Sequence, residues 1–433
     1  MVAKPYDGRE LRNEIHRLRP PLREITMLGM MIGTGKELPH FFNFMRSPVS
    51  AFYVGKIVLR FLRDMIVYRR PMRLVNGNAL VARLAKSCID RNVSIMTRSP
   101  VVELTREGNT VSGAIIDSPS GRVEIRAAKG VMLAAGGFSQ DVVRRKELFK
   151  HAPSGYEHVT PAAPGSTGDG LRLAEKAGGS IDDTLPQPAA WVPISRPLRS
   201  DGTLGTFPHF VDRSKPGVIA VTRSGRRFVN EANSYHDFCQ AMLARCTDEQ
   251  SEVCAFFITD HRAFRKYGLG FAKPSPVPYK HLVKTGYLFE AGSLAELAEQ
   301  IGVDAAQLKE TVSAFNRHAA NGEDPEFRKG STAYNRSLGD PNQKPNPCVA
   351  PIIRGPFYAV KLLIGDLGTF VGVRCDEHAR VLDQGGRPIN GLYAAGNDAV
   401  SIMGGNYPGG GTTLGPAITF GYIAAGHMAG ANR

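Results

Sequence analysis

The spacing of apolar residues in the first hundred positions predicts two helices. Apolar side chains recur at helical intervals over residues 54–68, and again over residues 79–88. An Asn-Gly-Asn run at 76–78 separates the two stretches, and Asn78 is placed to cap the second helix.

Shorter apolar stretches then predict a β unit. Strands are expected at 93–96, 101–104, 111–116 and 123–127. The turn at 106–109 makes a hairpin of the middle pair. The apolar run at 130–138 ends in two glycines before Phe138, as is typical of a buried strand in a parallel sheet. A glycine loop and a helix follow at 167–177, where Asp169 can cap the helix.

The composition changes after a proline-rich stretch at 185–197. The part beyond it contains a predicted strand, two predicted helices and a polar surface loop, at 218–222, 293–301, 305–321 and 330–351. Apolar runs at 357–363 and 371–373 return the chain to a sheet. The pattern predicts one domain in two pieces, 1–189 and 363–433, with a second domain inserted at 190–362.

The last apolar segment, residues 391–425, has the clearest chemical character. A short strand closes on Ala394-Ala395-Gly396, a glycine loop crosses Asn406–Gly411, and a helix of small and apolar residues begins at Leu414. Glycines let a flat ligand approach the backbone. A helix that begins beyond such a loop directs N–H groups and its positive dipole end at an anion, which suits a reduced flavin.

The glycine loop and the following LGPAITFGY run resemble the C-terminal flavin motif of the fumarate reductase/succinate dehydrogenase flavoprotein superfamily, and within it the 3-ketosteroid dehydrogenase branch. The GRRFVNEANSY run at 225–235 resembles the superfamily's capping domain. The resemblance covers nearly the whole chain. It implies an α/β fold, an incomplete Rossmann-like FAD-binding domain with an inserted α+β substrate (capping) domain, and it implies FAD as the cofactor.

The resemblance also implies the residues that contact the cofactor. Val102 in the hairpin would meet the adenine, and Ala135 and Gly136 would pass the cofactor after the buried strand. The C-terminal motif would add Gly396, Asn397, Thr413 and Leu414.

One expected feature is absent near the start of the chain. A strand followed by GxGxxG and a helix normally holds the pyrophosphate of FAD. Gly33–Lys36 is too short to supply it, so the chain resembles a truncated family member and we expect weak or absent FAD binding by these 433 residues. An inactive remnant, or a subunit whose partner supplies nucleotide binding, is the alternative to an active enzyme.

Dehydrogenation of a C–C bond beside a ketone requires a group that polarises the carbonyl, a base for the adjacent proton and a hydride acceptor. By the resemblance, Tyr407 and the Gly411 N–H polarise the ketone, and Tyr235 takes the proton if its neighbours lower its pKa. The implied partners are an apolar, steroid-like ketone and an electron acceptor. The family's additional N-terminal tyrosine has no match, because Phe41–Phe44 lacks a hydroxyl.

A fumarate reductase-type reaction on an unsaturated acid is the alternative chemistry. That branch carries an HGxNR-like loop where this chain has Asn406–Gly409. A tyrosine-bearing, apolar site suits a neutral ketone better than a diacid.

Charge and cysteine content narrow the choice of partners. The net charge is +14, and the densest basic patch, Lys56–Arg73, is either a solvated helix face or a helix on a membrane surface. No nucleic-acid-binding motif accompanies it. Six cysteines without a CxxC pair or Cys/His cluster argue against a metal site and predict reduced thiols in a cytoplasmic protein. No run reaches the about 18 apolar residues of a membrane span, and no signal core opens the chain.

Overall fold

The structure is a computed structural model that describes residues 4–27, 29–33, 37–45, 47–246 and 252–431. It divides into two compact units, Met1–Thr97 (unit 1) and Arg98–Arg433 (unit 2). Of the segment Gly33–Lys36, only Gly33 lies within the described residues.

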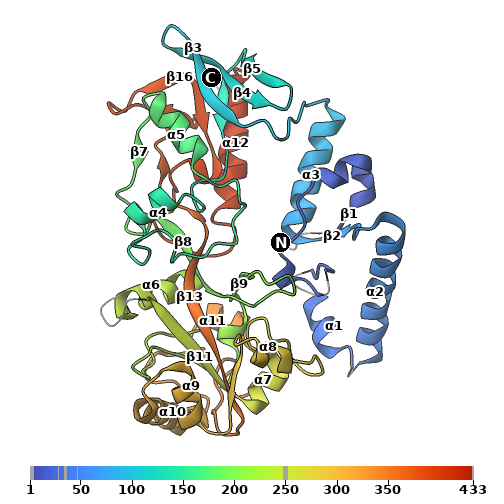
Figure 1. Ribbon diagram of the computed structural model, residues 1–433, viewed down its shortest axis with the longest axis vertical. Helices are drawn as coiled ribbons and strands as arrows, with labels where there is room; N and C mark the ends of the chain where they lie inside the picture. Colours follow the sequence, from blue (N-terminus) through green and yellow to red (C-terminus); the bar gives the residue numbers. More distant parts are fainter. Residues whose placement is uncertain (1–3, 28, 34–36, 46, 247–251, 432–433) are drawn as a thin grey trace. The chain divides into compact units, whose positions relative to one another are not determined.

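Unit 1 is mostly helical and contains one short antiparallel strand pair, β1 with β2 (Figure 1). Its elements are β1 (Tyr6–Asp7), η1 (Gly8–Arg17), η2 (Arg23–Ile25), α1 (Glu37–Asn43), α2 (Pro48–Tyr68), β2 (Arg73–Leu74) and α3 (Asn76–Asp90). Buried side chains from η1, β2 and α3, including Leu11, Leu74 and Ala82, form a small core.

Three expectations for unit 1 need correction. Helix α2 begins at Pro48 rather than near residue 54, because proline fits a first helical turn and the Ser47 hydroxyl caps it. Helix α3 begins at Asn76, with Val75 at its N-cap, so Asn78 is not the cap. First-turn N–H groups need no helical partner, which lets the Asn-Gly-Asn run fit there. Residues 93–96 form no strand.

The largest sheet of unit 2 has six strands, in the order β10-β11-β13-β8-β9, with β12 also paired to β13. Its strands are β8 (Ala189–Ser195), β9 (Phe207–Pro208), β10 (Val218–Val221), β11 (Cys254–Asp260), β12 (Phe289–Ala291) and β13 (Phe357–Thr369). The first half of β13 pairs with β11 and the second half with β8 (Figure 1). The predicted domain boundary at residue 362 falls inside β13, and the three-segment division stays a prediction.

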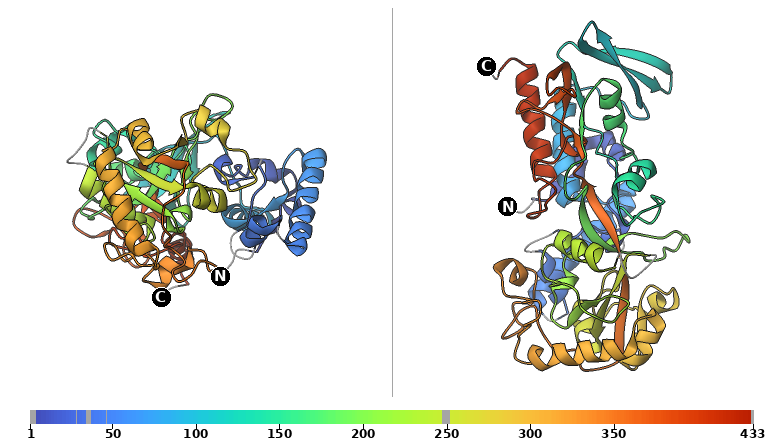
Figure 2. Two further views of the ribbon diagram at one scale, coloured as in Figure 1. Left: turned by 90° about the horizontal axis from the view of Figure 1, so that it is seen from below. Right: turned by 90° about the vertical axis from the view of Figure 1, so that its left-hand side faces the viewer.

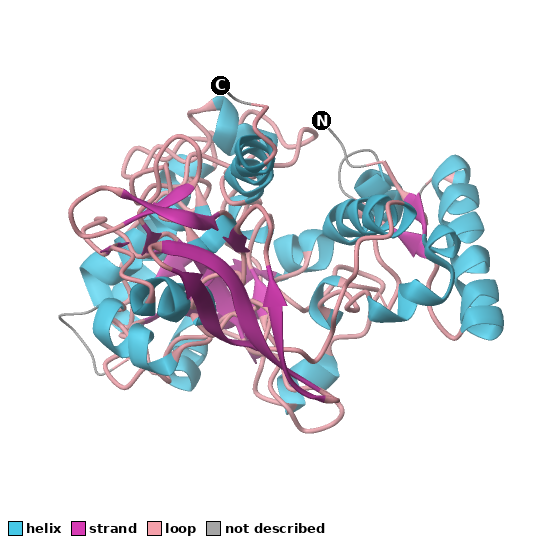
Figure 3. Cartoon of the chain, turned by 90° about the horizontal axis from the view of Figure 1, so that it is seen from above, coloured by secondary structure: helices cyan, strands magenta, loops and turns pink. Residues whose placement is uncertain are grey.

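Every residue of β8 and of β11 is buried, because helices lie along both strands and their neighbours (Figure 3). The helical elements of this region are η3 (Asp212–Ser214), α6 (Tyr235–Cys246), α7 (His261–Tyr267), α8 (Lys280–Lys284), α9 (Leu294–Ile301), α10 (Ala305–Ala319) and α11 (Ala333–Ser337). Side chains of Ser293 and Asp304 cap α9 and α10, which confirms both predicted helices. The predicted surface loop at 330–351 is partly wrong, because it contains α11 and the buried Asn335.

Two three-stranded sheets lie at the α12 end of unit 2 (Figure 2). One contains β3 (Val101–Glu107), β4 (Thr110–Ser118) and β5 (Gly121–Arg126) and confirms the predicted hairpin; the other contains β15 (Arg380–Leu382), β16 (Pro388–Ala394) and β6 (Val131–Leu133). Strand β6 pairs with β16 in parallel, as expected of the apolar run at 130–138, but the predicted buried interior strand is wrong, because β6 is three residues long, only partly buried and at the edge of its sheet. The remaining elements are α4 (Val142–Leu148), α5 (Asp169–Lys176), the pair β7 (Ile181–Asp182) and β14 (Gly372–Val373), η4 (Gly396–Asp398) and α12 (Leu414–Met428).

The predicted cap of α5 is wrong in detail. Gly168 holds the N-cap position with a left-handed backbone, and Asp169 is the first helical residue, where its carboxylate binds Thr167 and Arg172. The fold class, α/β, is confirmed. Among the helices of the described residues, none is both long and apolar enough to cross a bilayer.

Candidate active site

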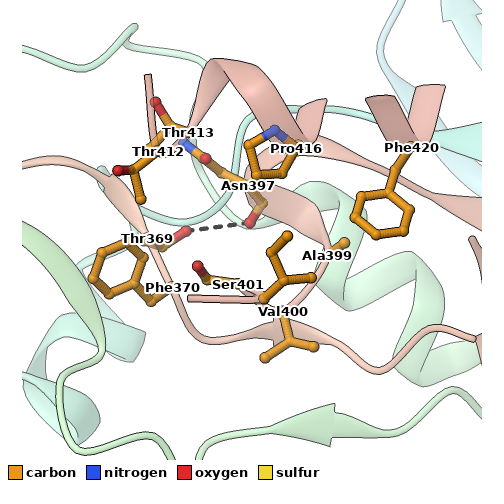
Figure 4. Close-up of a pocket in the computed structure, with 12 residues that line it drawn as sticks. Thr369, Phe370, Asn397, Ala399, Val400, Ser401, Thr412, Thr413, Pro416 and Phe420 are labelled. Atoms are coloured by element: carbon orange, nitrogen blue, oxygen red, sulfur yellow. Dashed lines mark hydrogen bonds between the residues drawn. The ribbon is translucent and has the colours of Figure 1, made fainter. Parts of the chain in front are cut away.

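The residues just before α12 and the first turns of that helix border a small, open cavity. Its wall is formed by β13 and the residue after it, by η4 and the segment that follows, and by the first turns of α12 (Figure 4). Its lining includes Thr369, Phe370, Asn397, Ser401, Thr413 and Pro416.

The cavity has the chemistry of a flavin site at the α12 end. Thr412 and Thr413 lie at the start of a 15-residue helix, where backbone N–H groups lack intrahelical acceptors and the dipole is positive. The Thr369 hydroxyl donates to the Asn397 carbonyl at 3.3 Å and holds the opposite wall (Figure 4). Of the seven predicted cofactor residues, Gly396, Asn397 and Thr413 line this cavity. These residues fit the anionic edge of an isoalloxazine ring.

The other predicted cofactor residues lie differently. The Ala135 N–H donates to the Asp398 carboxylate at 2.5 Å, and the Gly137 N–H donates to its second oxygen at 2.8 Å. The Ala135 N–H is therefore already bonded to the Asp398 side chain. Gly136 lies between the two residues that donate to this carboxylate. Val102 is half-buried on β3, and the Leu414 side chain is 52% exposed.

Two tyrosines that the sequence predicts to be catalytic meet beside the cavity. The rings of Tyr235, at the start of α6, and Tyr407, in the glycine loop, have centroids 4.9 Å apart. Both pack with Phe370 and Leu367 in one buried cluster, and Phe370 also lines the cavity. The structure thus brings together two tyrosines that are far apart in the sequence, and Phe370 connects them to the cavity wall.

The electrostatic surroundings of Tyr235 correct one expectation. Burial raises the pKa of Tyr235, and the neighbouring Tyr407 phenol adds to the increase, whereas a base would need a lowered pKa. Burial also raises the pKa of Tyr407. The guanidinium carbon of Arg213 lies 5.7 Å from the Tyr235 ring centroid and acts in the lowering direction. Among the neighbouring groups that shift the pKa of Tyr235, Arg213 therefore favours the phenolate.

Arg213 was not foreseen from the sequence. It is fully buried, and its Nη1 donates to the backbone carbonyls of Glu231 and Asn233. Its Nε and Nη2 have no hydrogen-bond acceptor of good geometry among the described residues, although the Tyr334 phenol lies near enough to favour the charged form. A buried guanidinium beside Tyr235 makes Arg213 a candidate member of the site.

Gly411, the third predicted catalytic residue, lies in the same loop as Tyr407. Its φ is +104°, and no atom lies within 4 Å of the position where a Cβ would be. This backbone conformation favours glycine and leaves one side of the residue open to a ligand.

A second buried network, also unforeseen, supports β13 from the side of the Gly136 turn. Asp366 accepts hydrogen bonds from the Ser139 hydroxyl at 2.7 Å and the Gly368 N–H at 2.8 Å, and its other oxygen lies 2.6 Å from His158 Nε2. His151 Nε2 is 2.9 Å from His158 Nδ1. Burial lowers the pKa of His151 to about 3, so its imidazole ring is uncharged near neutral pH.

The chain is also similar to a known protein family and to known enzymes. The model of the FAD binding domain family matches residues 3–414. The chain is 43% identical over 430 residues to 4-oxocyclohex-2-ene-1-carboxylate 5-dehydrogenase of Sinomonas cyclohexanicum, covering 99% of this chain and 72% of that protein. It is 34% identical over 435 residues to 3-oxosteroid 1-dehydrogenase of Mycolicibacterium smegmatis, covering 98% and 74%.

A solved structure gives the same result for the fold. The crystal structure of 3-ketosteroid delta1-dehydrogenase from Sterolibacterium denitrificans in complex with 1,4-androstadiene-3,17-dione superposes with a TM-score of 0.88 at 34% identity. The match covers 99% of this chain and 77% of that one.

Proposed function

This chain belongs to the FAD binding domain family and is an FAD-dependent oxidoreductase of CH–CH groups, and we propose that it dehydrogenates a ring ketone at the C–C bond beside the carbonyl. The observation that carries the proposal is the Tyr235–Tyr407 pair, which packs with Phe370 of the cavity wall.

We infer the following roles for the site residues. The Tyr407 hydroxyl and the Gly411 N–H hydrogen-bond the ketone oxygen and stabilise the negative charge that develops there. Tyr235 takes the proton from the adjacent carbon, and the positive charge of Arg213 stabilises the phenolate that results. The α12 end of the cavity would hold the flavin through Gly396, Asn397 and Thr413, and bound FAD would supply the hydride acceptor.

Two substrate classes fit this chemistry. A steroid-like 3-ketone is supported by the relatives that carry that name and by the buried apolar rim formed by Phe370 and Leu367. A smaller ring ketone that carries a carboxylate is supported by the 43% identity to the Sinomonas enzyme. A fumarate reductase-type reaction has less support, because the rim beside Tyr407 is apolar.

The test is a turnover assay on purified full-length chain incubated with FAD. Flavin retention is measured first, by the absorption band of the desalted protein. Reduction of an artificial dye is then followed with 4-androstene-3,17-dione, with 4-oxocyclohex-2-ene-1-carboxylate, and with succinate. We expect dye reduction with at least one ring ketone and none with succinate. A flavin-loaded protein that turns over neither ketone would refute the proposal, and an absence of bound flavin would support the inactive alternative.

A further inference from the structure

Helix α2 exposes an apolar face over its whole length. Only Ser50, Val54, Ile57 and Asp64 of its 21 residues are buried. The large apolar side chains that remain exposed on or just before the helix are Met45, Val49, Phe52, Leu59, Leu62, Met65, Ile66 and Val67. Met45, Phe52, Leu59 and Ile66 are seven residues apart, which is about two helical turns, so Phe52, Leu59 and Ile66 follow one stripe.

This stripe is unusually exposed for large apolar side chains. Phe52, Leu59 and Ile66 are 78%, 69% and 82% exposed. Single exposed apolar residues are common, but a contiguous apolar patch on a folded protein marks an interaction surface. The helix itself is well formed, with Ser47 as its cap and Arg69 in a left-handed conformation at its end. The exposure is therefore not caused by a frayed element.

The charges on α2 select the kind of partner. Lys56 and Arg63 are exposed and each follows a stripe residue by four positions, which places them on the same face. Asp64, the single acidic residue of α2, is buried and accepts hydrogen bonds from Arg63 and from the Met72 N–H. The exposed face is consequently apolar and net basic: Arg63 is paired with the buried Asp64, while Lys56 is exposed and makes no ion pair with the described residues.

This combination fits an anionic lipid surface better than a second copy of the chain. Two copies joined through this face would bring Lys56 and Arg63 against their own counterparts, at an electrostatic cost. A helix with apolar residues and Lys/Arg on its exposed side lies in the plane of a bilayer interface, with the apolar groups about 5–10 Å deep and the cations at the phosphates. The aliphatic stems of Lys and Arg allow this arrangement.

We propose that α2 docks this protein on the surface of an anionic phospholipid bilayer, with Phe52, Leu59 and Ile66 in the acyl boundary and Lys56 and Arg63 at the headgroups. The proposal does not depend on the ketone chemistry. It would give the enzyme access to apolar compounds that partition into lipid.

The experiment is sedimentation of the full chain with phosphatidylcholine vesicles, with and without phosphatidylglycerol. We expect binding to the vesicles that contain phosphatidylglycerol and weaker binding as salt increases. Phe52→Ser with Ile66→Ser should lower the partition coefficient at least tenfold, because two large apolar side chains no longer enter the acyl boundary. Lys56→Glu should weaken binding to the anionic vesicles alone.

Matched controls distinguish docking through α2 from nonspecific adsorption of exposed apolar side chains. Val143 on α4 and Ile353 are also well exposed, at 65% and 66%, and Val143→Ser with Ile353→Ser should bind as the unmodified chain does. Circular dichroism of each variant checks that the fold is kept. Equal binding of the α2 variants and the unmodified chain, or no binding to anionic vesicles, would overturn the proposal. So would a dimer that dissociates in the Phe52/Ile66 variant, since it would assign the face to a second copy.

Discussion

The run at 225–235 and the glycine loop at 404–414 both belong to unit 2, and they differ in where their polar groups are directed. In the first run, Arg227 is buried and binds Glu231 at 2.9 Å and Asp324 at 2.7 Å. In the glycine loop, Thr412 and Thr413 line a cavity, although the Thr412 hydroxyl also donates to the Gly409 carbonyl at 2.5 Å. The first run directs its charged groups at one another inside the fold, whereas the second places polar residues at a cavity wall.

The difference has consequences for substitution. A buried charge that loses its partner is costly, because the remaining charge stays out of water without compensation. A group that faces a cavity can be removed at little cost to folding, but its loss is felt when a ligand or transition state occupies the cavity. Stability and activity should therefore respond separately to changes in the two runs.

The largest effect is expected from Arg227→Met. Glu231, whose pKa the Arg227 and Lys329 charges help to lower to about 2, would lose its main partner, and Asp324 would lose its two bonds from Arg227 and keep the one from the Lys329 N–H. We expect the free energy of unfolding to fall by about 3–5 kcal/mol. Urea denaturation measures this, with Arg226→Met as the control because Arg226 is exposed next to it. Similar stability of the two variants would mean that the network does not hold this domain.

Tyr407→Phe should have the opposite profile. Loss of the hydroxyl removes a donor to the ketone oxygen, and we expect kcat to fall about 10²–10³-fold. Stability and flavin retention should change little, because the ring still fills the cluster with Phe370. Tyr422→Phe is the control, since Tyr422 is 81% exposed on α12. A variant with normal kcat would remove Tyr407 from the mechanism.

The sequence predicts local features of the chain but not the partners that lie far away along it. Helix α9 is predicted closely because its cap, Ser293, and its apolar spacing are all local. The predicted strand at 93–96 is wrong, because a short apolar run forms a strand only where a neighbouring strand accepts it.

The site residues likewise divide into those that a local motif predicts and those that only the fold brings together. Gly396, Asn397 and Thr413 are found from one contiguous motif, and the structure adds the cavity they line. Asp398 binds the Ala135 N–H across 263 positions of the chain, and no local signal announces such a pair. Arg213 is equally hidden, because its importance lies in its distance to Tyr235 and not in its sequence neighbours.

His151 offers a smaller effect that depends on pH. Its pKa is about 3 in the folded chain, against 6.5 as its ordinary value, because burial disfavours the charged ring. The unfolded chain therefore binds a proton that the folded chain does not, and the free energy of unfolding falls as pH drops below about 6.5. The loss from this one residue is about 2 kcal/mol between pH 7.5 and pH 5.

The measurement compares urea denaturation at pH 7.5 and pH 5 in two variants. His151→Gln should show a smaller loss of stability on acidification than the unmodified chain. His281→Gln, at an exposed position, should follow the unmodified chain. An identical pH dependence in all three proteins would exclude His151 as a source of acid sensitivity.

The smallest expected effect comes from Gly411→Ala, and it separates backbone strain from space within the glycine loop. Gly411 has a φ of +104° with open space around the added methyl group, while Gly409 has the same open space without a left-handed backbone. Gly411→Ala should therefore cost about 1–2 kcal/mol of local strain, shift the N–H away from the ketone and lower kcat/KM by about tenfold. Gly409→Ala should leave kcat/KM unchanged. If both variants lose activity equally, the loop needs room for a ligand at both positions, and the conformation of Gly411 is not what fixes the oxyanion contact.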